Sequence, residues 1–149
     1  MDSRAADRKV RVLVIEDNPA DVELLRLALN SAQIDCELTV LEDGAEALAF
    51  IRQVGAGSQE GSPDLTVLDL NLPKRDGVEV LQAIRATGAF AGAPVAVLSS
   101  SASPRERARI EQFNIGRYIT KPANLDEFLN IGFVLKQLLR ECGPPNSSA

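Results

Sequence analysis

The sequence predicts an α/β fold, a single doubly wound and five-stranded parallel sheet with helices on both faces. Segments rich in β-branched residues alternate with helical patterns five times along 149 residues, which is a normal length for one domain. The first, third and fourth of the predicted strands are continuously apolar, as expected for strands buried on both faces of a parallel sheet. Hydrophobic residues form 45% of the chain, enough to bury a core.

The first strand-helix unit is predicted at residues 9–31. The run KVRVLVI at 9–15 is the strand, and the polar sequence EDNPAD ends it. Asn18 is predicted to cap the helix that follows, Pro19 to occupy its first position and Asp21 to supply the acid of a capping box. The apolar stripe of this helix, spaced at helical intervals, consists of Val22, Leu25 and Leu29.

The same alternation predicts the remaining elements. Four further runs of β-branched and apolar residues predict strands at 36–41, 65–70, 93–100 and 117–120. Apolar residues at helical spacing predict helices at 44–53, 78–87, 104–113 and 125–140. The Gly- and Ser-rich stretch 54–63 is predicted to be a surface loop. The folded domain is therefore expected at 9–140, with flexible tails at 1–8 and 141–149, because GPPNSSA cannot hold a helix.

Charge and composition exclude several classes of protein. The chain has 21 acids and 16 bases, a net charge of -5, which argues against a surface that binds nucleic acid or an anionic membrane. The basic run RERAR at 105–109 is interrupted by Glu106 and is expected to be a solvated helix face. The apolar runs are too short to span a bilayer and the polar start lacks a signal peptide, so a cytoplasmic protein is expected. Cys36 and Cys142 show no metal-ligand spacing and are expected to be reduced.

Polar side chains gather where the predicted strands end. They are Glu16 and Asp17 after the first strand, Asp69 at the third, Ser99 and Ser100 at the fourth, and Thr120 and Lys121 at the fifth. Ligands of an open parallel sheet bind beyond this carboxyl edge. A lone acid at a strand end is usually a helix cap or a loop residue. Here carboxylates, a hydroxyl and an ammonium group are all expected at the same edge of the sheet, which predicts a functional site.

The residue types of this cluster indicate phosphoryl chemistry. Two carboxylates about 4 Å apart repel each other by about 4 kcal/mol at an effective dielectric constant of about 20, and a divalent cation removes that repulsion. Oxygen ligands without His or Cys favour magnesium or manganese. Asp69 can then act as a nucleophile towards a phosphoryl group, while Lys121 and Ser99 hold the other oxygens of that group.

Four motifs resemble the receiver domain of two-component response regulators over about residues 9–140. They are EDN, LDLNLPKRDG, VLSSSA and YITKP. The resemblance implies a flavodoxin-like receiver fold with strand order 2-1-3-4-5. It also implies that the protein accepts a phosphoryl group from a phosphohistidine of a sensor kinase with Mg²⁺ or Mn²⁺. Such a protein is not an enzyme on other substrates, because it promotes transfer to, and hydrolysis from, its own Asp69 only.

The resemblance also implies a role for each site residue. Glu16, Asp17 and Asp69 match the metal-binding acids, and Asn71 matches the residue that lends a backbone carbonyl to the metal. Asp69 matches the phosphoacceptor and Lys121 the lysine that pairs with phosphate. The two positions of the family's switch are matched by Ser99 and Tyr118.

The resemblance implies protein partners as well. The sequence is most similar to the stand-alone regulators that partner bacterial phytochrome kinases, which implies a histidine kinase upstream and a further protein downstream. A wide apolar arc on the last helix, together with analogy to the family, predicts a homodimer through 117–120 and 125–140. The residues of this arc are Phe128, Phe133, Val134, Leu135 and Leu139.

Three alternative functions need separate consideration. A flavodoxin-like FMN binder needs a phosphate cradle of Ser, Thr or Gly after the first strand, where this chain has Glu16 and Asp17. A metal-dependent phosphatase of the haloacid dehalogenase type has an acid two residues after its nucleophile, where Asn71 stands here. A degenerate receiver would act as a binding module without phosphorylation, which the complete set of site residues disfavours.

Overall fold

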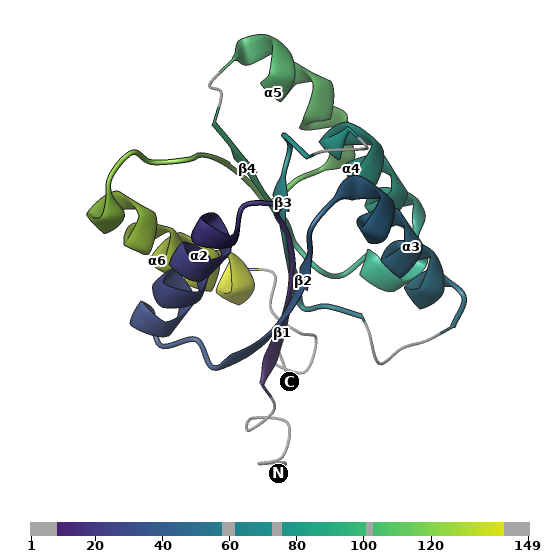
Figure 1. Ribbon diagram of the computed structural model, residues 1–149. Coiled ribbons are helices and arrows are strands. Elements are labelled where there is room, and N and C mark those ends of the chain that lie inside the picture. Colours follow the sequence, from purple (N-terminus) through teal and green to yellow (C-terminus); the bar gives the residue numbers. More distant parts are fainter. Residues whose placement is uncertain (1–8, 58–61, 73–75, 101–102, 142–149) are drawn as a thin grey trace.

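A computed structural model describes residues 9–57, 62–72, 76–100 and 103–141 of the chain (Figure 1). The tail predicted at 1–8, most of the tail predicted at 141–149 and Cys142 lie outside these residues, as does part of the predicted loop 54–63. The last helix reaches Glu141, one residue beyond the predicted domain boundary.

The element order follows the predicted alternation of strands and helices. The strands are β1 (Val10–Ile15), β2 (Cys36–Leu41), β3 (Leu65–Asp69), β4 (Val95–Ser99) and β5 (Arg117–Thr120). The α-helices are α2 (Pro19–Ser31), α3 (Gly44–Gly55), α4 (Gly77–Ala86), α5 (Pro104–Ile110) and α6 (Leu125–Glu141). Two 3₁₀ turns follow α4 and α5, η2 (Gly88–Phe90) and η3 (Glu111–Phe113).

The five strands form one parallel sheet in the order β2-β1-β3-β4-β5, which confirms the predicted fold class and topology. Helices α2 and α6 lie on one side of this sheet, and α3, α4 and α5 lie on the other (Figure 1). The register pairs Asp69 with Leu98 and Ser99 with Thr120, so the ends of three neighbouring strands meet at one edge.

Each face of the sheet has its own hydrophobic core because successive strand residues point to opposite faces. Val12 and Val14 pack under α2 and α6, whereas Leu13 and Ile15 pack under α3 and α4. All residues of β3 and β4 are buried, which is why their sequences show no alternation of apolar and polar side chains. The central strands therefore form a rigid support for the residues that follow them.

Two predicted segments differ from the structure. The surface loop predicted at 54–63 begins too early, because α3 extends to Gly55 and Val54 is buried. The segment predicted as a helix at 104–113 consists of α5, which ends at Ile110, and the 3₁₀ turn η3. Ile110 is the one buried side chain of α5, so little apolar contact holds this segment in a regular helix. Asn114 then takes a left-handed φ of 55° and ends the turn.

No helix among the described residues is both long enough and apolar enough to cross a bilayer.

Helices α2 and α6 pack closely at a glycine. A β-carbon added at Gly132 would collide with the backbone carbonyl of Ala28 and press on the side chain of Ala32. Beside this contact, Lys136 Nζ donates a hydrogen bond of 2.8 Å to the carbonyl oxygen of Ala32 at the end of α2. The face of the sheet that carries Val12 and Val14 is therefore covered by a tightly fixed helix pair.

Gly132→Ala is expected to lower the free energy of unfolding by about 2 kcal/mol, because the added methyl group meets backbone that cannot move aside. Urea unfolding followed by circular dichroism would measure this. Gly92→Ala is the matched control, since its added β-carbon meets open space and should change stability by less than about 0.5 kcal/mol. Equal stability of the two variants would show that the α2–α6 contact is looser than described.

Candidate functional site

The predicted acidic residues meet at the carboxyl edge of the sheet. Glu16 and Asp69 are 2% and 3% exposed, and Asp17 is exposed. One carboxylate oxygen from each of Glu16, Asp17 and Asp69 lies within 4.8 Å of the other two. The structure thus brings together the three carboxylates that the sequence predicted as neighbours.

The backbone ladder of the sheet continues past the strand ends and places these residues. The N–H of Glu16 donates to the carbonyl of Leu41 at 2.9 Å, and the N–H of Lys121 donates to the carbonyl of Ser99 at 2.7 Å. These bonds extend the pairing of β1 with β2 and of β4 with β5 by one residue. Site residues positioned in this way inherit the rigidity of the sheet.

Lys121 is surrounded by three carboxylates. Its Nζ donates hydrogen bonds to Asp21 Oδ2 at 2.8 Å and to Asp69 Oδ2 at 3.2 Å. Nζ also lies 3.0 Å from Glu16 Oε1, an ion-pair contact that lacks the alignment of a hydrogen bond. Burial alone would lower the pKa of Lys121, but Asp21, Glu16 and Asp69 together raise that pKa above its ordinary value. Lys121 is therefore a fixed positive charge beside Asp69.

The pKa of Glu16 shows that the single positive charge of Lys121 does not neutralise the negative charge of this cluster. Burial, aided by the charge of Asp69, raises the pKa of Glu16 to about 7 in spite of the lowering effect of Lys121. Among the described residues, the ion-pair contact with Lys121 is the one polar contact of the buried Oε1 of Glu16, and it is not an aligned hydrogen bond. Glu16, Asp17 and Asp69 fit a divalent cation, because they offer hard oxygen ligands and need an added positive charge.

Local hydrogen bonds orient the two buried acids, Glu16 and Asp69. The N–H of Asn18 donates to Glu16 Oε2 at 3.1 Å, and the N–H of Asn71 donates to Asp69 Oδ1 at 2.9 Å. Asp69 therefore has one oxygen on a backbone N–H and the other on Lys121. Asn71 is placed beside the phosphoacceptor candidate as predicted, while the use of its backbone carbonyl for a metal stays a prediction.

The predicted capping box of α2 is wrong. Asn18 caps the helix as predicted, because its side chain accepts a hydrogen bond from Ala20 N at 3.0 Å, and Pro19 is the first helical residue. The N–H of Asn18, which a capping box would pair with Asp21, goes to Glu16 instead. Asp21 contacts Lys121 and is a site residue that sequence reasoning missed. The spacing of Asp21 fits both roles, so the sequence alone offered no signal that separates them.

A second group of polar side chains lies next to the acidic cluster. The fully buried Ser99 donates its hydroxyl proton to Glu106 Oε1 at 2.6 Å, and Tyr118 donates to the same oxygen at 3.0 Å. Burial raises the pKa of Tyr118, and Glu106 adds to this rise. The two predicted switch residues are thus joined through an acid that was not predicted to be part of the site.

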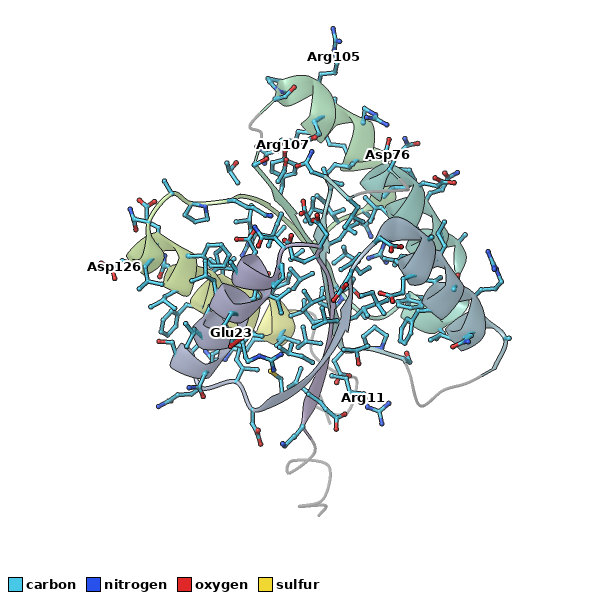
Figure 2. All side chains as sticks on the ribbon, viewed as in Figure 1. Arg11, Glu23, Asp76, Arg105, Arg107 and Asp126 are labelled. Carbon is cyan, nitrogen blue, oxygen red and sulfur yellow. The ribbon has the colours of Figure 1, made fainter. Side chains whose placement is uncertain are left out.

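The segment 105–109 is largely a solvated helix face, as predicted, because Arg105, Arg107 and Arg109 are exposed. Some of its side chains also contact the body of the domain: Glu106 is half-buried, Arg107 lies 5.1 Å from the centre of the Tyr118 ring, and Arg109 Nη2 contacts Asp76 Oδ2 at 2.9 Å. Arg105 projects away from the molecule, while Arg107 points back towards the strand ends (Figure 2). The contacts of these charged side chains attach α5 to the domain, because this short helix has only one buried apolar side chain.

Comparison with known proteins identifies the family. A model of the response regulator receiver domain matches residues 12–131. The chain belongs to this family. It is 37% identical to Response regulator Rcp1 of Synechocystis sp. over 120 residues, which cover 80% of this chain and 82% of Rcp1. The chain spans about half the length of some longer curated relatives that it matches.

Solved structures of phytochrome response regulators are similar to this receiver domain. The phosphorylated cyanobacterial phytochrome response regulator RcpA superimposes with a TM-score of 0.77 at 36% identity, covering 87% of this chain and 93% of RcpA. The Mn²⁺-bound form of Rcp1 superimposes with a TM-score of 0.75 at 34% identity, covering 86% of this chain and 92% of Rcp1. These matches confirm the predicted resemblance to stand-alone regulators of the phytochrome type.

The receiver-domain identity sets aside the FMN-binding and phosphatase alternatives, since receiver domains act as phosphoryl acceptors in two-component signalling.

In metal-free buffer, Asp69→Asn is expected to raise the free energy of unfolding by about 1 kcal/mol, because it removes one charge from a carboxylate-rich cluster. Thermal unfolding would measure this. Added Mg²⁺ should stabilise the unchanged protein more than the variant. Glu37→Gln, at an exposed acid of β2, is the control and should change stability little. A destabilised Asp69→Asn protein would contradict this account of the site's electrostatics.

Proposed function

We propose that Asp69 accepts a phosphoryl group from a phosphohistidine of a histidine kinase. The observation that supports this most strongly is the double contact of Asp69, whose buried carboxylate is held by Asn71 N–H and by Lys121 inside a cluster of acids. Such a carboxylate is oriented for attack on phosphorus. The positive charge of Lys121 also lies where the phosphorylated product will carry more negative charge.

The transfer step follows from this geometry. A carboxylate oxygen of Asp69 forms the new bond to phosphorus, the bond between phosphorus and the kinase histidine nitrogen breaks, and the electron pair returns to the imidazole. Lys121 then moves its contact from Asp69 to an oxygen of the transferred group, while Asp21 keeps hold of its ammonium. Glu16, Asp17, Asp69 and the backbone carbonyl of Asn71 would hold Mg²⁺ or Mn²⁺, which supplies positive charge to the phosphoryl oxygens. Slow hydrolysis of the acyl phosphate would return Asp69 to its free state.

The similarity to phytochrome response regulators supports a phytochrome-type kinase as the phosphodonor and a further protein as the target of the phosphorylated form. We place the protein in the cytoplasm on the sequence argument alone. A separate observation, the net charge of -5, supports the proposal that it binds neither nucleic acid nor membrane surfaces.

Incubation with acetyl phosphate and Mg²⁺ is expected to add one phosphoryl group, because the receiver site supplies the catalysis. Intact-mass measurement would show the added mass. Asp69→Asn should abolish the labelling, and Asp126→Asn, remote from the site, should leave it unchanged. Equal labelling of all three proteins would refute the assignment of Asp69, and a complete lack of labelling would favour the binding-module alternative.

We also propose a homodimer through β5 and α6. Two residues of the predicted apolar arc on α6, Phe128 and Leu135, are buried in the hydrophobic core of the domain. Phe133 is 53% exposed on α6 and remains to be covered by a partner. Analogy with the family and this exposed aromatic residue support the proposal.

Light scattering is expected to give the mass of a dimer for the unchanged protein and of a monomer for Phe133→Glu, because a charge in an apolar contact costs several kcal/mol. Leu27→Glu is the matched control, since Leu27 is a similarly exposed apolar residue on α2, outside the proposed interface. A monomer mass for the unchanged protein at high concentration, with and without phosphorylation, would refute the dimer.

A further inference from the structure

Glu106 holds two hydroxyl groups with a single oxygen. Ser99 Oγ and Tyr118 OH both donate to Glu106 Oε1, at 2.6 and 3.0 Å. Ser99 is fully buried and Glu106 half-buried, so water competes little for these bonds. A short hydrogen bond to a charged acceptor is among the stronger polar contacts in a protein.

Glu106 and a phosphoryl group on Asp69 would compete for the same hydroxyl proton of Ser99. A serine hydroxyl has one proton to donate. In this structure that proton is given to Glu106, and it cannot at the same time be given to a phosphoryl oxygen on Asp69. Ser99 can reach the phosphorylated arrangement only by giving up Glu106 as its acceptor.

We propose that Glu106 is a positioning residue of the unphosphorylated state, a competing acceptor that the phosphoryl group on Asp69 must displace from Ser99. This inference rests on the proposed function and adds a residue to it. Glu106 opposes phosphorylation by stabilising the resting arrangement, and its removal shifts the population towards the phosphorylated one.

Glu106 belongs to α5, so loss of its hydrogen bond with Ser99 would also affect the position of this surface helix. Helix α5 has one buried side chain, Ile110, and several polar contacts to the body: Glu106 to Ser99 and Tyr118, Arg107 to the Tyr118 ring, and Arg109 to Asp76. Loss of the Ser99 bond removes one of these attachments. Movement of α5 and of the Tyr118 side chain is therefore the expected result of phosphorylation.

The test compares the affinity of variants for beryllofluoride with Mg²⁺, a stable mimic of the phosphoryl group. Calorimetric titration measures the half-saturating concentration without dependence on a probe. Glu106→Ala is expected to lower that concentration about 5- to 10-fold, within the usual range of coupling between sites. Glu106→Gln keeps the size of the side chain and a weaker acceptor, so it should give a smaller decrease. Glu111→Ala, an exposed acid in the adjoining turn η3, should leave the value unchanged.

A double-mutant cycle separates competition from simple anchoring of α5. If Glu106 acts through the Ser99 proton, Glu106→Ala should improve binding in the unchanged protein but not in a Ser99→Ala background. An equal improvement in both backgrounds, or no improvement in either, would overturn the inference. Failure of the unchanged protein to bind beryllofluoride would instead overturn the proposed function together with this inference.

Tyr118 supplies a spectroscopic readout that needs no phosphoryl mimic. It is the only tyrosine of the sequence, which contains no tryptophan, so ultraviolet titration reports on this residue alone. Because the charge of Glu106 helps to raise the pKa of Tyr118, Glu106→Gln should lower that pKa while Glu111→Ala leaves it unchanged. An unchanged pKa in Glu106→Gln would show that the two side chains are not joined in solution, and would overturn the inference even if the alanine variant fails to fold.

Discussion

The receiver site depends on an imbalance of charge at the edge of the sheet. Lys121 contacts Glu16, Asp21 and Asp69, and Asp17 adds a fourth acid nearby. One ammonium group keeps the buried acids in place without neutralising them, as the raised pKa of Glu16 shows. The remaining demand for positive charge suits the site to a divalent cation, whose charge can also compensate the negative oxygens of a phosphoryl group.

The sheet and its helices serve this arrangement by fixing the strand ends. Central strands β1, β3 and β4 are buried between two cores, and the backbone bonds of Glu16 and Lys121 continue their pairing. By contrast, α5 is held mostly by charged side chains. The site is therefore rigid and the helix beside it is weakly attached. A conformational switch needs this difference in local stability, because a small change at the site can then move α5 without unfolding the rest of the domain.

The elements of the fold and most of the site could be predicted because they depend on short-range patterns, whereas the strand order was predicted from the family resemblance. Continuous apolar runs identified the buried strands, and the strand ends identified Glu16, Asp69, Ser99 and Lys121 as neighbours. Asp21 and Glu106 were missed for one physical reason. Each stands in the first turn of a helix, where an acid ordinarily caps or stabilises that helix, and only the packing of the helix shows that its carboxylate faces another strand.

The central claim is that the carboxylate of Asp69, and no other acid of the cluster, forms the acyl phosphate. Borohydride reduces an acyl phosphate of aspartate to homoserine, which peptide mass spectrometry can locate after phosphorylation by a histidine kinase or by acetyl phosphate. The account predicts homoserine at position 69 alone, although Glu16, Asp17 and Asp21 lie close by. Reduction at one of these neighbours, or at none of the four acids in a protein that has gained phosphate, would contradict it.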